Sequence, residues 1–202
     1  MEDIASFNKL FDRVIRHYHL RDDIDQDFIN PQEVGTLSHL LYQKCWVDTV
    51  QWHLEDQIRD TEIDPSRALA IKRRIDSSNQ LRTDLVEKID DFYLDHFKNV
   101  VFQNGATTNT ESPAWAIDRL SILALKIYHM IEQVGRSGVD EQHRGLAQQK
   151  LDILNVQMED LTISIGELIQ DIRAGRRLMK VYRQMKMYND PLLNPVLYRD
   201  FK

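Results

Sequence analysis

Apolar residues recur along the chain at spacings of three and four, which is the pattern of amphipathic helices. In residues 3–20, for example, Phe7, Leu10, Phe11 and Val14 share one helical face. Strand-like alternation is almost absent, so the sequence predicts an all-α fold, a helical bundle. Together with residues 3–20, the expected helices cover about residues 32–59, 64–98, 112 to a break at 135–138, and 140–188. Gly166 and Gly175 are candidate interruptions of the last of these helices.

The segment SPAWAIDRLSILALKIYHM, which begins at Ser112, is apolar on every face of a helix. Serine caps helices well, and the proline after it suits the first helical position. A helix that is apolar all round is normally surrounded by other elements. Asp118, Arg119 and Lys126 nevertheless lie within it, and a buried charge must find a partner or cost several kcal/mol. We therefore expect a central helix whose charges join a partly buried polar network.

The chain is expected to form a single domain over residues 1–202. Residues 32–98 and 112–172 predict two long hairpins, and some residues recur in the same order in both, such as Asp84 and Asp160. One interpretation is an internal duplication that builds a pseudo-twofold bundle, and the other is the shared composition of amphipathic helices. An N-terminal helix and a C-terminal basic helical extension complete the predicted bundle.

Composition changes this interpretation little. The chain has 202 residues, a net charge of −6 and one cysteine, Cys45. The acidic balance argues against a nucleic-acid partner, and a single cysteine fits a reducing compartment. Neither a secretory signal nor a run of roughly 20 apolar residues is visible. We expect a cytoplasmic bacterial protein. Contact with the surface of a membrane remains an open alternative. The long helices with apolar faces also favour a homodimer.

Charged and aromatic residues gather on the predicted helices in a way that suits a ligand site. Lys44, Asp48 and Glu55 lie along one stripe of the second helix, and Arg82 lies mid-stripe on the third. Paired charges beside tryptophan can orient and stack a sugar or nucleotide. The alternative is a network that only fixes helix register, with ordinary core tryptophans. The candidate ligand-binding cluster is Lys44, Asp48, Glu55, Arg82, Asp84, Asp118, Arg119 and Lys126, and the candidate aromatic lining is Trp46, Trp52 and Trp115. Asp160 is also expected to contribute to the partly buried network.

Other chemistries have weaker support. A di-iron carboxylate bundle needs Glu-x-x-His pairs, and the chain contains none. The nearest approaches to metal-ligand spacing are His53 with Asp56 and the pair His17 and His19, so we expect no metal and no cofactor. The phosphate-binding glycine loop, the nucleophile elbow and the zinc-type cysteine pair are all missing.

Residues 173–186 are rich in Arg and Lys, with no acidic residue among them. Three interpretations remain open for this segment. It is a basic amphipathic face for anionic lipid or a phosphate-bearing ligand, it docks on acidic residues of the same chain such as those in residues 22–27, or it is a solvated helix.

Four stretches together resemble an uncharacterised bacterial family, domain of unknown function 4254. They are INPQEVGTLSHLLYQKCWVDTVQWHLED, RRIDSSNQLRTDLVEKID, TNTESPAWAIDRLSILALKIYHM and KVYRQMKMYNDPLLNP. Members of that family are often encoded near glycosyltransferases of surface-polysaccharide assembly, so the resemblance implies a link to glycans. It implies no catalytic residues, because the family has no assigned reaction.

Three functional hypotheses follow. The first is an auxiliary protein that recognises an anionic small molecule or a protein partner in surface-polysaccharide assembly. The second is an enzyme, a transferase or hydrolase that acts on a phosphorylated or nucleotide-linked sugar, with Glu55, Asp48 or Asp118 as general base. The third is a scaffold that binds a membrane or a subunit through its basic C-terminal helix.

Overall fold

The computed structural model describes residues 3–185, 187 and 190–198. The regular structure of these residues consists of five α-helices and one isolated β-bridge, so the all-α prediction is confirmed. Within this described part, none of the helices is both long and apolar enough to cross a membrane. The helices are α1 (Ile4–Tyr18), α2 (Leu37–Ile58), α3 (Pro65–His96), α4 (Pro113–Gly135) and α5 (Glu141–Arg173).

Each helix begins after a residue whose side chain caps it. The Asp64 carboxylate accepts hydrogen bonds from the amides of Ser66 and Arg67, and the Ser112 hydroxyl accepts one from the amide of Trp115. The prolines that follow both caps stand in the first helical turn, where no amide donor is needed. The expected start of the central helix at Ser112 is therefore confirmed.

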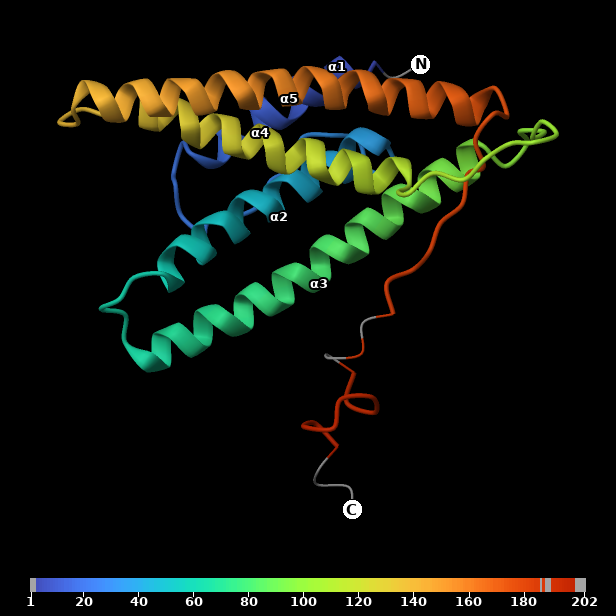
Figure 1. Ribbon diagram of the computed structural model, residues 1–202. Coiled ribbons are helices and arrows are strands. Elements are labelled where there is room, and N and C mark those ends of the chain that lie inside the picture. Colours follow the sequence, from blue (N-terminus) through green and yellow to red (C-terminus); the bar gives the residue numbers. More distant parts are fainter. Residues whose placement is uncertain (1–2, 186, 188–189, 199–202) are drawn as a thin grey trace.

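The helices form two hairpins, α2 with α3 and α4 with α5, and α4 packs against each of the other four helices. Figure 1 shows α4 beneath α5 and above α2 and α3, which is the central position that its apolar sequence predicts. The turn between α2 and α3 points away from the α4–α5 hairpin, so the two hairpins diverge at that end (Figure 1). The duplication of residues 32–98 as 112–172 stays a prediction, because two packed hairpins arise without it.

The main core lies where α1 packs against α2 and α4. Phe11, Val14 and Tyr18 of α1 are fully buried, as are Leu41 of α2 and Ile117 of α4. Burial of one side chain of this size contributes roughly 1.5–3 kcal/mol. The apolar face of α1 therefore holds α2 and α4 together, and this fixes the frame in which their polar residues meet.

The predicted continuation of the last helix is wrong for residues 174–185, and of the two expected interruptions the one at Gly175 is where the helix ends, whereas Gly166 lies within α5. α5 ends two residues before Gly175, which adopts a left-handed φ of 72°. The Gly175 amide donates to the Ile172 carbonyl and the Arg176 amide to the Asp171 carbonyl, which is the hydrogen-bond pair of a Schellman helix end. A Cβ at Gly175 would lie 2.5 Å from the backbone oxygen of Val101, so this close approach requires glycine.

Residues 176–184 run extended along the body of the protein. The Leu178 amide donates to the Thr107 carbonyl at 2.9 Å. Arg183 lies 3.6 Å from the Glu87 carboxylate and also pairs with Asp91, both on α3. This segment docks on acidic residues of its own chain, but on α3 instead of the expected residues 22–27.

The scaffold hypothesis loses its basic helix with this result, since an extended segment has no amphipathic helical face to offer a membrane. Lys186 and Tyr188, at the end of the predicted helix, lie outside the described residues.

Candidate functional site

A buried charged network joins α2, α3 and α4. Lys44 is fully buried, and its ammonium lies 2.5 Å from Asp48 Oδ2 and 2.8 Å from Asp118 Oδ1. Arg82 donates to both carboxylate oxygens of Asp118, at 2.9 and 2.7 Å. The Ser121 hydroxyl donates to Asp48 Oδ2 at 2.6 Å. Because two cations face two carboxylates, the network balances its charge where water is largely excluded.

The two carboxylates of the network have opposite pKa shifts. Burial raises the pKa of Asp48 more than Lys44 lowers it, and the nearby Asp118 charge adds to the rise. Burial acts on Asp118 too, but Lys44 and Arg82 outweigh it and lower the pKa of that carboxyl. Asp48 Oδ1 has no hydrogen-bond partner in the described chain, and the Arg82 Nε atom lies 3.5 Å away. Asp48 is therefore the carboxylate with an unused acceptor.

A pocket of about 340 Å³, here called the Trp52 pocket, opens beside the network. Its lining residues are Asp48, Gln51, Trp52, Glu55, Asp56, Arg59, Arg82, Ile122 and Leu125. Arg59 pairs with Glu55 at 3.3 Å, while the Arg82 side chain is 27% exposed. The volume lies at the lower end of the range for small-molecule sites. Asp48, the Arg82 guanidinium and Trp52 thus line one space of sugar size.

Half of the predicted polar cluster meets as expected. Lys44, Asp48, Arg82 and Asp118 form the network, and they come from three different helices. Glu55 lines the adjoining pocket, where it pairs with an arginine of its own helix. The role of these residues in binding a ligand stays a prediction.

The other half of the predicted cluster lies outside the network. Asp84 is exposed on α3 and accepts a hydrogen bond from Gln80. Arg119 is exposed and lies 2.5 Å from Glu111, and Lys126 is exposed as well. The expectation of a place in the buried network is therefore wrong for Asp84, Arg119 and Lys126, and also for Asp160, which is exposed on α5. Arg119 and Lys126 are exposed because their side of α4 faces an open groove toward α5.

The three tryptophans lie in different environments. Trp46 is buried and packs edge-on against Tyr18, with ring centroids 5.4 Å apart, so it belongs to the core. Trp52 is half-buried and lines the pocket named after it. Trp115, in the first turn of α4, packs against the core and is not among the residues that line the Trp52 pocket. Only one of the three expected lining residues therefore reaches this pocket.

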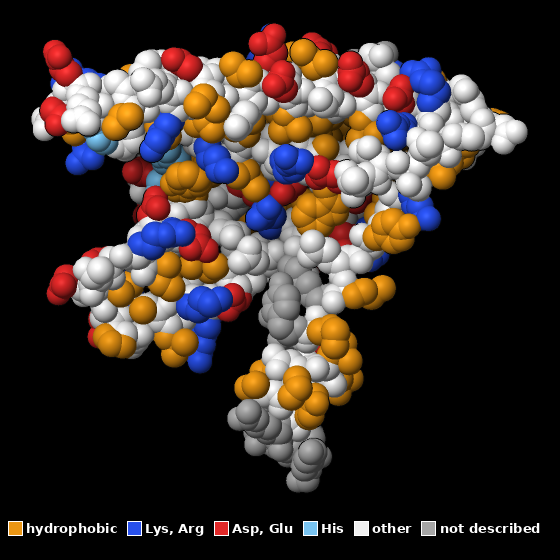
Figure 2. Space-filling model, in the orientation of Figure 1, with side chains coloured by type: hydrophobic (Ala, Val, Ile, Leu, Met, Phe, Trp, Pro, Cys, Tyr) orange, Lys and Arg blue, Asp and Glu red, His pale blue; other side chains and the backbone are white. Residues whose placement is uncertain are grey.

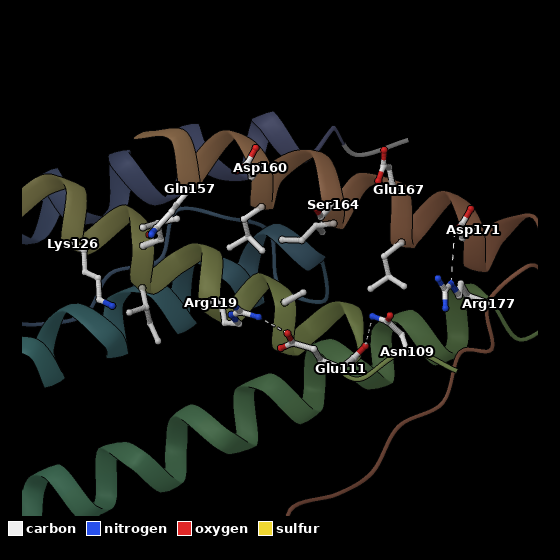
Figure 3. Close-up of a pocket in the computed structure, with 16 residues that line it drawn as sticks. Asn109, Glu111, Arg119, Lys126, Gln157, Asp160, Ser164, Glu167, Asp171 and Arg177 are labelled. Atoms are coloured by element: carbon white, nitrogen blue, oxygen red, sulfur yellow. Dashed lines mark hydrogen bonds and ion pairs between the residues drawn. The ribbon is translucent and has the colours of Figure 1, made fainter. Parts of the chain in front are cut away.

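The groove between α4 and α5 has a volume of about 830 Å³ and is drawn in Figure 3. Arg119 and Lys126 line it from α4, and Asp160 lines it from α5. Figure 3 shows Arg177 turned toward Asp171 at the end of the groove opposite Lys126. Basic and acidic side chains are interspersed around it with exposed apolar ones, as Figure 2 shows. This mixture favours neither sign of ligand charge.

A histidine cluster that the sequence did not predict lies beside the Trp52 pocket. His19, which follows α1, His53 on α2 and His129 on α4 each direct one ring nitrogen toward the others, all within 4.8 Å. Trp52 stacks on His129 with ring centroids 4.8 Å apart, and so connects the cluster to the pocket. The three positions lie far apart in the chain and form no local motif, so only the fold brings them together.

Comparison with known proteins identifies a family but no characterised relative. The model of the family described as "Protein of unknown function (DUF4254)" matches residues 38–181. No curated protein and no solved structure matches the chain. The matched range contains the whole charged network and every residue that lines the Trp52 pocket.

Proposed function

The chain belongs to the DUF4254 family, and we propose that it binds a polyhydroxylated small molecule in the Trp52 pocket. The ligand class is a sugar, free or in phosphorylated or nucleotide-linked form. The observation that carries the proposal is Asp48, a residue that lines this pocket and whose buried Oδ1 atom lacks a hydrogen-bond partner in the described chain.

The energetics of Asp48 favour a hydroxyl donor. A buried acceptor without a partner costs about 1–3 kcal/mol, and more when it is charged. A sugar hydroxyl that donates to Asp48 Oδ1 recovers this cost. Arg82 adds guanidinium donors for a second hydroxyl or a phosphate, since its side chain remains partly exposed in the pocket.

Trp52 supports the same ligand class through apolar contact, which complements the polar contacts of Asp48 and Arg82. An indole beside polar groups offers apolar surface to the C–H face of a sugar ring. The lining also includes the apolar side chains of Ile122 and Leu125. The genetic link to surface-polysaccharide assembly that the family resemblance implies is part of this proposal, and it directs the choice of ligands to test.

The test is a thermal-shift screen followed by calorimetry, with free hexoses, hexose phosphates and nucleotide-linked hexoses as ligands. We expect one of them to raise the melting temperature and to bind with one site per chain. Trp52→Leu should abolish this binding, whereas the matched variant Trp115→Leu should retain it. No stabilisation by any ligand, or equal loss of affinity in both variants, contradicts the proposal.

A second candidate function is catalysis on the same ligand. It is favoured by the opposite pKa shifts of Asp48 and Asp118, because two carboxyl groups whose environments separate their pKa values can divide acid and base roles. Asp48, whose pKa is raised, would act as the general base toward a ligand hydroxyl or water. Chromatography of nucleotide-linked hexoses incubated with the protein tests this: turnover that Asp48→Asn removes supports it, and an unchanged ligand contradicts it.

A further inference from the structure

Three histidines from separate helical elements surround one point. The ring centroids of His19 and His53 lie 5.1 Å apart, those of His19 and His129 5.2 Å, and those of His53 and His129 5.4 Å. The Nε2 atoms of His19 and His53 approach to 3.2 Å. Three imidazoles in a near-equilateral triangle present their nitrogens to a common centre.

The hydrogen bonds on the far side of two rings fix which nitrogen faces that centre. His19 Nδ1 lies 2.7 Å from the Ile15 carbonyl, which can only accept, so Nδ1 carries the proton. His129 Nδ1 lies 2.7 Å from the Glu132 carboxylate, and its Nε2 is buried with no hydrogen-bond partner in the described chain. A carbonyl or carboxylate behind a histidine is the outer-shell arrangement of metal ligands. Both rings therefore turn an Nε2 lone pair inward.

A partly exposed carboxylate lies at the edge of the cluster, near two of the three histidines. Asp22 Oδ1 lies 3.6 Å from His53 Nε2 and 4.0 Å from His19 Nε2. Asp22 is also the one non-glycine residue with a positive φ, 52°, in the described chain. The turn after α1 thus holds this side chain against the histidines through an uncommon backbone conformation.

Aromatic rings hold the histidines in place. Tyr18 stacks on His53 with ring planes 12° apart, and Trp52 stacks on His129 at 9°. Tyr128 stacks on His19 with centroids 4.3 Å apart. Side chains packed in this way have little rotational freedom left to lose when they bind an ion, and such preorganisation strengthens binding.

We propose that His19, His53, His129 and Asp22 form a binding site for a divalent transition metal of the zinc class. Imidazole nitrogen and carboxylate oxygen are ligands that Zn²⁺ accepts, at about 2.0–2.2 Å and in tetrahedral geometry. Ligand atoms around such an ion lie roughly 3.3 Å apart. The histidine nitrogens lie within 4.8 Å of one another, so small movements of the side chains toward the centre bring them to this spacing.

This site departs from the expectation of no metal, which rested on local sequence spacing alone. His17, one of the residues singled out there, points elsewhere and lies 2.5 Å from the Tyr42 hydroxyl. The site is independent of the sugar proposal, but the Trp52–His129 stack lets a bound ion fix one wall of the Trp52 pocket.

The experiment loads the chelator-treated full chain with ZnCl2 and with CoCl2. We expect one metal ion per chain by elemental analysis and the visible absorption of four-coordinate cobalt. His53→Ala and His129→Ala should lose this binding, while His96→Ala, which changes an exposed histidine on α3, should keep it. Failure of the wild-type chain to bind one equivalent overturns the proposal, as does binding that all three variants retain.

Glu132→Gln tests the site without a substitution in the core, because the Glu132 side chain is 49% exposed. This variant is therefore expected to fold normally. Loss of the carboxylate behind His129 should weaken zinc binding about 10–100-fold, with an unchanged circular dichroism spectrum. If Glu132→Gln binds zinc as tightly as the wild-type chain does, the proposed role of His129 as an oriented ligand is wrong.

Discussion

Replacement of Lys44 by methionine tests whether the buried network stabilises the fold. Methionine fills a similar volume but leaves Asp48 and Asp118 to share the single charge of Arg82. Removal of one partner from a buried charge group typically costs about 3–5 kcal/mol, because the remaining charge is left unpaired. We expect Lys44→Met to lower the free energy of unfolding by that amount.

The chain contains a matched control for this change. Lys72 and Asp76 on α3 have the same i,i+4 spacing as Lys44 and Asp48, but both side chains are about half exposed. An exposed pair of this kind is worth under about 1 kcal/mol. Lys72→Met should therefore be nearly neutral although it removes the same chemical group.

A double-mutant cycle isolates the interaction itself. Asp48→Asn restores charge balance to the Lys44→Met variant and leaves the two-bond pair of Arg82 with Asp118 intact. The double variant should be more stable than the sum of the single losses by about 1–3 kcal/mol. Urea unfolding followed by circular dichroism at pH 7 measures all four proteins. The reasoning is refuted if Lys44→Met costs no more than Lys72→Met, or if the cycle shows no coupling.

Three further predictions concern other parts of the molecule. Burial raises the pKa of Asp90 from 3.8 to about 6, so its ionisation costs stability as the pH rises through that window. Asp90→Asn should match the wild type in urea unfolding near pH 4 and exceed it by at most about 3 kcal/mol at pH 8; equal curves at both values count against this. Gly175→Ala should lower the melting temperature, because its Cβ would meet the Val101 oxygen and its φ is left-handed. Proteolysis should cut the segment after α5 faster in Arg183→Ala, which loses its ion pair with Asp91, and raised salt should have the same effect on the wild type.

The network could be predicted from the sequence because its members are charged residues that interrupt the apolar pattern of their helices. Asp118 lies on a helix whose every face is apolar, and its burial with Lys44 and Arg82 follows from the cost of an unpaired charge. The same argument placed Lys126 wrongly. Helical periodicity reports which face is apolar, but it does not say where a neighbouring helix leaves an open groove along that face.

Two other features depended on contacts between distant parts of the chain. The sequence offers Gly175 as a candidate break, but the apolar and basic residues after it have a helix-like pattern that does not reveal their extended pairing with residues 103–107. His19, His53 and His129 have no shared spacing, and they meet only because α1, α2 and α4 pack together.

Carbon-13 NMR of the aspartate carboxyl groups tests most directly whether Asp48 receives the ligand. The measurement titrates the protein alone and with the sugar that raises its melting temperature most. Without ligand, the pKa of Asp48 should lie above its ordinary value and that of Asp118 below. A ligand hydroxyl that donates to Asp48 Oδ1 favours the ionised form, so the pKa of Asp48 should fall on binding. A ligand that binds and leaves the Asp48 titration unchanged would contradict the account.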